Sequence, residues 1–263
     1  MGESWKKNFS YDEMKDFLEL KYLQFNNPEF IRYDPVSIPH QYKLKQDIEI
    51  SGFLTATISW GRRDLIINSA KDLMNMMGDS PLDFVMNVGD EGLGSIGRFY
   101  YRTFNGNDCT TFIRGLRNIY SRYDSMEDIL AACLEKGGSW KEAIISLRNE
   151  FFNLPHKTRT LKHFADISRG AAGKRLNMFF RWMVREDNHG VDFGVWKKID
   201  ESLLYIPLDF HTGNISRKLG LLERRQDDWK AVEELTSVLR QFDEKDPVKY
   251  DFSLFGLGIV EKF

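Results

Sequence analysis

The chain has 263 residues, of which 42% are hydrophobic and 14% aromatic, and its charged residues leave a formal net charge of −2. This aromatic content excludes a disordered chain and allows a substantial core. The two cysteines, Cys109 and Cys133, are too few for a disulfide framework, a four-cysteine zinc site or a cubane iron–sulfur cluster. No apolar run approaches the roughly 18 residues that span a bilayer, and the charged N-terminal segment lacks a signal peptide's apolar core. We therefore expect a soluble cytoplasmic protein with no membrane partner.

Helix signals follow one another along the chain. Capping boxes open helical patterns at residues 10–26 and 139–153, and a cap residue before a proline opens others at 80–81 and 246–247. Helical periodicity covers, in chain order, about residues 43–60, 63–77, 108–123, 126–136, 159–166, 174–185, 212–219 and 227–242. No long stretch alternates with period two, so the sequence predicts an all-α protein of about ten helices.

Two long connections, residues 26–42 and 187–208, carry most of the prolines and several glycines. No repeat or low-complexity tract divides the chain further. We therefore predict one compact all-α protein over residues 1–263, a two-lobed helical bundle whose functional segment lies at about residues 156–221.

Basic residues are concentrated between His156 and Arg185, where eight of them and one acid, Asp166, give a local charge of +7. Such a block is typical of a phosphate-binding face, although a solvated helix face gives the same pattern. The eight are Lys157, Arg159, Lys162, Arg169, Lys174, Arg175, Arg181 and Arg185.

A glycine-rich turn, Gly-Ala-Ala-Gly at residues 170–173, precedes a predicted helix that begins near Lys174. Its short side chains let a phosphate approach the free N–H groups at the helix start. Arg175 and the positive end of the helix dipole both disfavour the charged form of Lys174, which is one way to make a lysine nucleophilic. A tight turn followed by a surface lysine is the alternative interpretation.

An aspartate, Asp209, follows an apolar approach at residues 206–208 and stands at the start of the next predicted helix. The simplest role for such an aspartate is to cap the helix. A carboxylate held there can also face a site and stabilise positive charge that develops opposite it.

Together, these two segments resemble the helix-hairpin-helix DNA glycosylase superfamily. Residues 170–177, Gly-Ala-Ala-Gly-Lys-Arg-Leu-Asn, are similar to its hairpin Leu-Pro-Gly-Val-Gly-Arg-Lys-Thr-Ala, although the first glycines are spaced differently. Residues 208–212, Leu-Asp-Phe-His-Thr, followed by Arg-Lys-Leu-Gly-Leu at 217–221, look like its Val-Asp-Thr-His segment and the helix after it. The resemblance implies that Lys174 is a nucleophile and Asp209 the catalytic carboxylate.

Two further comparisons refine this resemblance. The interval between Lys174 and Asp209 is nearer to that of the archaeal oxoguanine glycosylases than to the endonuclease III branch, whose iron–sulfur cysteines have no counterpart here. Most of the chain also resembles a bacterial conserved-hypothetical family of about this length. A location in the bacterial cytosol or nucleoid is therefore expected.

The glycosylase resemblance implies a base-excision glycosylase and AP lyase that works without a cofactor. Its partner is double-stranded DNA with a flipped damaged base, and an oxidised purine is one candidate. The residues expected to contact DNA are Arg169, Gly170, Gly173, Arg175, Arg181, Arg62, Arg63 and Arg217. The residues expected to line a base pocket are Trp182, Trp196, Phe210 and His211.

Two alternative hypotheses belong to other functional classes. The first is a non-catalytic protein that binds DNA structures on the same fold, with Lys174 contacting only phosphate. The second is a metal-dependent hydrolase, because Asp187, His189 and Asp192 lie within six residues of one another and are ligand types suited to a divalent metal.

Overall fold

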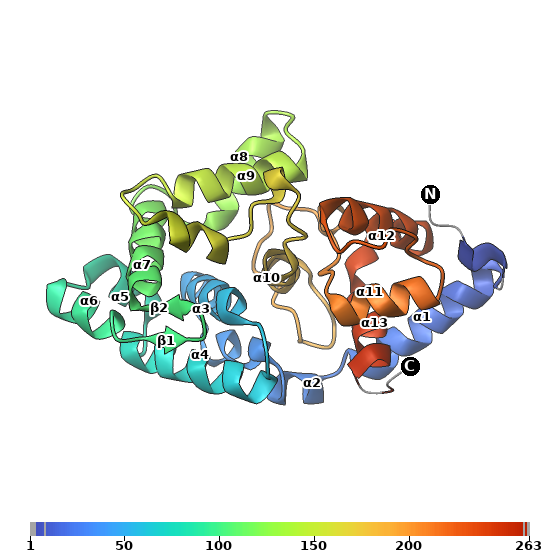
Figure 1. The fold of residues 1–263 in the computed structure, drawn as a ribbon, viewed down its shortest axis with the longest axis horizontal. Coiled ribbons are helices and arrows are strands. Elements are labelled where there is room, and N and C mark those ends of the chain that lie inside the picture. Colours follow the sequence, from blue (N-terminus) through green and yellow to red (C-terminus); the bar gives the residue numbers. More distant parts are fainter. Residues whose placement is uncertain (1–3, 8, 260, 262–263) are drawn as a thin grey trace. The chain divides into compact units, whose positions relative to one another are not determined.

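The computed structural model describes residues 4–7, 9–259 and 261. Helices account for 66% of the residues. The sheet among these residues is a two-stranded antiparallel hairpin of β1 (Tyr100–Tyr101) and β2 (Phe104–Asn105). The predicted all-α fold is confirmed (Figure 1). Within the described ranges, every helix is too short or too polar to cross a membrane.

The chain divides into two compact units. Unit 1 consists of Met1–Phe30 and Ile167–Phe263, and unit 2 of Ile31–Asp166, so the functional segment predicted at 156–221 crosses the division. The α-helices of unit 1 are α1 (Tyr11–Phe25), α10 (Lys174–Val184), α11 (Phe210–Lys218), α12 (Trp229–Phe242) and α13 (Tyr250–Ile259). Its 3-10 helices are Ser4–Lys7, Ile167–Arg169, Glu201–Leu203 and Pro247–Lys249.

Helix α2 (Pro28–Arg32) spans the division between the units. The other α-helices of unit 2 are α3 (Lys45–Ile58), α4 (Arg63–Met77), α5 (Pro81–Asn87), α6 (Asp90–Ile96), α7 (Gly106–Tyr120), α8 (Met126–Glu135) and α9 (Trp140–Phe151). Its 3-10 helices are Pro35–Ser37, Pro39–Gln41 and Thr158–His163. Short α2 and the glycine-containing α6 have too few periodic apolar residues to be recognised from the sequence.

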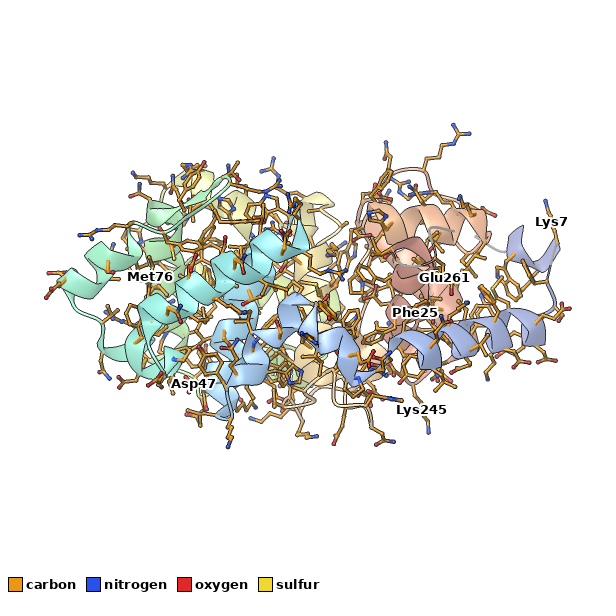
Figure 2. The ribbon with its side chains drawn as sticks, turned by 90° about the horizontal axis from the view of Figure 1, so that it is seen from below. Lys7, Phe25, Asp47, Met76, Lys245 and Glu261 are labelled. Carbon is orange, nitrogen blue, oxygen red and sulfur yellow. The ribbon has the colours of Figure 1, made fainter. Side chains whose placement is uncertain are left out.

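Unit 2 is built around α3, which is buried along nearly its whole length. The Phe53 ring on α3 packs against the rings of Phe112, Phe151 and Phe164 at centroid distances of 5.9, 5.4 and 5.4 Å. Asp47 of α3, labelled in Figure 2, accepts the backbone N–H of Leu82 at 2.7 Å and so fixes the start of α5. Aromatic packing and this buried cap hold the helices of unit 2 together.

One predicted helix of unit 2, residues 159–166, is wrong: the segment forms the 3-10 helix Thr158–His163. The Thr160 hydroxyl and the Arg159 guanidinium both donate to the buried carboxylate of Asp108, at 2.6 and 2.7 Å. These tertiary hydrogen bonds compete with the regular helical pattern.

In unit 1, α13 contacts both α1 and α11. A Cβ on Gly256 would lie 2.1 Å from the ring of Phe25, so glycine is what permits the close approach of α13 to α1 (Figure 2). A Cβ on Gly258 would lie 3.3 Å from the Cβ of His211. Helix α13 therefore lies directly against the start of α11, the helix that Asp209 caps.

Candidate functional site

The turn before Lys174 requires its two glycines. Gly170 and Gly173 have φ angles of +88° and +65°, a backbone region that other residues rarely adopt. The N–H of Trp229 donates to the Gly170 carbonyl at 3.0 Å, and Ala171 forms a bridge with Asp228. The turn is thus attached to the start of α12, and α10 begins directly after Gly173 without a side-chain cap.

Asn177 connects the Lys174 segment with the Asp209 segment. Its side chain is 2% exposed, and its amide donates to the carbonyls of Ala172 at 3.3 Å and Ile206 at 3.5 Å. One carbonyl belongs to the turn before Lys174 and the other to the approach that leads to Asp209. This buried amide fixes the two segments relative to each other.

The structure brings Lys174 and Asp209 together although 35 positions separate them. The Lys174 Nζ lies 3.7 Å from Asp209 Oδ2, and the two side chains are 30% and 24% exposed. Asp209 Oδ1 meanwhile accepts the backbone N–H groups of His211 and Thr212 at 2.9 and 3.0 Å. The cap and the lysine contact therefore use different oxygens of Asp209, and the amine and the carboxylate face each other within several ångströms, as the proposed roles of Lys174 and Asp209 require.

Further along α10, Arg181 and Arg185 are buried, with side chains 5% and 2% exposed. Arg181 pairs with Asp192 at 3.3 Å and, at closer range, with Asp251 of α13. Its guanidinium also lies over the ring of Phe252. The surrounding carboxylates offset the cost of burying this charge.

Arg185 contacts three carboxylates, those of Asp187, Asp192 and Asp246, at 2.6, 3.0 and 2.8 Å. Burial opposes its charge, but the carboxylates outweigh this and raise the pKa of Arg185. Burial also works to raise the pKa of Asp187, but Arg185 and a hydrogen bond from Asn26 outweigh burial and lower it. The arginines and carboxylates together form a buried ion cluster (Arg181, Arg185, Asp187, Asp192, Asp246 and Asp251).

Asp251 links the ion cluster with the lysine–aspartate pair. Burial raises the pKa of Asp251 to about 6; Arg181 and Lys174 oppose this shift, whereas Asp209 and Asp192 add to it. Asp251 therefore interacts electrostatically with both members of the pair. The sequence analysis assigned it no role, although a single acid within the apolar run of α13 is a signal that could have identified it.

Several predicted DNA-binding and pocket residues lie in the interior. Arg181 is wrong as a DNA contact, because it is 4% exposed and its guanidinium is used by Asp192 and Asp251. Trp182 and Trp196 are wrong as pocket residues, because they are 0% and 1% exposed and belong to the core. Two of the eight charges in the basic block, Arg181 and Arg185, are thus internal.

Other predicted residues are at the surface. Phe210 is 68% exposed beside Asp209, and His211 is exposed next to it, with ring centroids 5.7 Å apart. Arg169 and Gly170 are exposed in the turn, whereas Gly173 is buried. These residues lie at or next to the starts of α10 and α11.

Of the remaining arginines, Arg175 is partly buried, and the other three have acidic neighbours. Burial lowers the pKa of Arg175 to about 10. Arg217 pairs with Asp227 at 2.6 Å and donates to the Arg224 carbonyl. In unit 2, Arg62 pairs with Asp64 at 2.6 Å, and Arg63 lies 4.0 Å from Asp34. Each of these pairs reduces the positive charge available to a phosphate.

The alternative metal site is contradicted by the geometry. Asp187 and Asp192 are both occupied by Arg185, and Asp187 Oδ1 also accepts the N–H groups of His189 and Gly190. Among the residues that the structure describes, no three His, Cys, Asp or Glu side chains are grouped so that they could hold a metal ion. The Asp-Asn-His-Gly segment is a turn built around Asp187.

Comparison with models of protein families identifies the family of this chain. Residues 34–260 match the family described as a protein of unknown function, DUF2400. The chain belongs to this family. The matched range includes both the Lys174 and the Asp209 segments and most of both units. No curated protein and no solved structure matches the chain.

Proposed function

We propose that this member of the DUF2400 family is a DNA-binding base-excision glycosylase and AP lyase, with Lys174 as nucleophile and Asp209 as its carboxylate partner. The observation that carries the proposal is the 3.7 Å approach of Lys174 Nζ to Asp209 Oδ2, with both side chains partly exposed. An amine and a carboxylate that are close together and accessible can exchange a proton and then meet a substrate.

The chemistry begins with transfer of a proton from the Lys174 ammonium to Asp209 Oδ2. The neutral amine attacks the sugar C1′ carbon of a flipped nucleotide, and the C1′–N bond to the base breaks as the N–C1′ bond forms. The base leaves with the bonding electrons and takes the proton held by Asp209. One proton then moves from the lysine nitrogen to O4′ as the C1′–O4′ bond breaks, which opens the sugar ring and leaves a protonated Schiff base. The Asp209 carboxylate accepts a C2′ proton as the bond from C3′ to the 3′ phosphate breaks.

Asp209 is suited to this role because the backbone holds it in place. Its Oδ1 accepts two N–H groups at the start of α11, which fix the carboxylate while Oδ2 faces the amine. As the departing base takes up the proton, the Asp209 carboxylate becomes ionised again and stabilises the positive charge that develops on the sugar. Exposed Phe210, next in the chain, offers a flat ring against which a base can stack.

The deciding experiment captures the Schiff base with borohydride. Duplexes that carry an oxidised purine or an abasic site should give a covalent protein–DNA adduct with the wild-type chain. Lys174→Gln should abolish the adduct because the nucleophile is absent. Asp209→Asn should slow base excision roughly a hundredfold or more while keeping a helix cap, since asparagine also caps well.

Lys218→Gln is the matched control, because it removes an exposed lysine at the other end of α11. This variant should form the adduct at the wild-type rate. Duplex binding without an adduct, for any lesion, would leave a protein that binds DNA structures with Lys174 contacting phosphate. An adduct that persists in Lys174→Gln would refute the assignment of the nucleophile.

A further inference from the structure

One face of α10 carries positive charge from the surface to the interior. Lys174, Met178, Arg181 and Arg185 are spaced by four, three and four residues, which places them on the same side of the helix. The Lys174 Nζ lies 3.9 Å from the Met178 sulfur, so the lysine side chain extends along this face toward the turn that carries Arg181. The charge of Lys174 is thus not isolated from the buried ion cluster.

Asp251 is the acid on α13 that contacts this face, through its ion pair with Arg181. Asp251 is 7% exposed, and its carboxylate forms this ion pair. Helix α13 also contacts α11, the helix that Asp209 caps. Asp251 therefore lies where the lysine, the capping aspartate and the buried arginine can all influence it.

We infer that Asp251 is a positioning residue for the Lys174–Asp209 pair. The buried negative charge of Asp251 stabilises the cation that forms at Lys174. This inference rests on the proposed lyase function. The protonated Schiff base keeps a full positive charge on the lysine nitrogen after Asp209 has given up its proton to the base. A carboxylate in a poorly solvated interior favours that cation more strongly than one in water.

Arg181 keeps Asp251 ionised and oriented. Without a cation, a carboxyl buried to this degree would bind a proton and lose its effect. The charged groups that act on Asp251 are Arg181 and Lys174 of α10, Asp209 before α11, and Asp192 of the connection after α10. Because burial brings the pKa of Asp251 to about 6, its charge is present above that pH and is lost below it.

The test compares Asp251→Asn with the wild type in the full chain. The rate of the borohydride-trapped adduct with an abasic-site duplex is measured from about pH 5 to 8 under single-turnover conditions. The wild-type profile should contain an inflection near pH 6. Asp251→Asn should lack that inflection and should be slower by about tenfold above it, since asparagine cannot ionise. Asp251→Glu should restore the inflection.

Asp246→Asn is the matched control for the loss of a buried carboxylate. Asp246 belongs to the same ion cluster, but it pairs with Arg185. We expect this variant to lose stability yet keep the wild-type inflection. A pH profile that is the same in Asp251→Asn as in the wild type would overturn the inference.

A second measurement does not depend on activity. Acylation of Lys174 by a small amine-reactive reagent, followed by mass spectrometry, reports how much free amine exists at each pH. In Asp251→Asn the labelling should begin at lower pH than in the wild type, because a nearby negative charge favours the ammonium form. If the wild type forms no adduct but labelling shifts, the lyase proposal fails while the electrostatic role of Asp251 stands. If neither changes, Asp251 is only structural.

Discussion

The two ends of α10 carry the same kind of residue in opposite environments. At the first end, Lys174 follows a glycine turn, is 30% exposed and meets one carboxylate that also caps another helix. At the other end, Arg185 is 2% exposed and is enclosed by three carboxylates. The comparison shows that charge density along a sequence does not distinguish a binding face from an internal ion cluster. The segments that fold against each end make the difference.

The largest expected effect is on stability at the buried end. Arg185→Met should lower the free energy of unfolding by about 3–5 kcal/mol, because it leaves buried carboxylates without their cation. Lys174→Met at the exposed end should change it by about 1 kcal/mol or less. Urea denaturation of both variants measures the difference. Equal losses would mean that the two ends of α10 do not differ in burial.

A second test uses the pH dependence of the unfolding free energy and concerns Asp251, which pairs with Arg181 between the two ends of α10. Burial raises the pKa of Asp251 from 3.8 to about 6, so the folded protein binds this proton more tightly than the unfolded chain does. Its contribution to stability is therefore fully present below about pH 4 and is lost as the pH rises through about 6. Relative to Asp251→Asn, the wild type should lose about 2–3 kcal/mol across this range.

The measurement is the unfolding free energy of both proteins at several pH values. Other acids, such as Asp187 and Asp243, have lowered pKa values and act in the opposite direction, so only the difference between the two proteins is informative. A difference that stays constant across the range would show that folding does not raise the pKa of Asp251.

The smallest effect on stability is expected in the turn before α10. Arg169→Glu reverses an exposed charge and should change the unfolding free energy by about 0.5 kcal/mol or less. If this end faces DNA, the variant should bind duplex more weakly, and the log–log dependence of its affinity on salt should become shallower by about one unit. Unchanged affinity and salt dependence would remove the turn from any DNA-binding surface.

Helix positions were predictable where local signals are strong. The capping boxes at Ser10 and Ser139 open α1 and α9, and Ser80 caps α5, all as predicted. Each of these signals depends on atoms within four residues of one another, so neighbouring sequence contains the necessary information. The prediction of a helix at residues 159–166 was wrong because the side chains of Arg159 and Thr160 hydrogen bond to Asp108, some fifty positions away.

The lysine–aspartate pair was predictable only through the resemblance between two separated segments. Neither the glycine turn nor the capping aspartate specifies a distance to the other. The buried amide of Asn177, which donates to both segments, supplies that distance in the tertiary structure. No local sequence pattern at residues 174–177 predicts this role for Asn177.

The sequence by itself determined the helical class, the caps and the residue types able to perform amine–carboxylate chemistry, because these depend on composition and local spacing. Only the tertiary structure decided that Arg181, Trp182, Arg185 and Trp196 are interior residues. The physical reason is that burial depends on which segments pack against a helix, and the packing partners of α10 come from residues as distant as Asp246 and Asp251. Whether the charged residues on one side of a helix are exposed or buried is decided only when those partners pack against it.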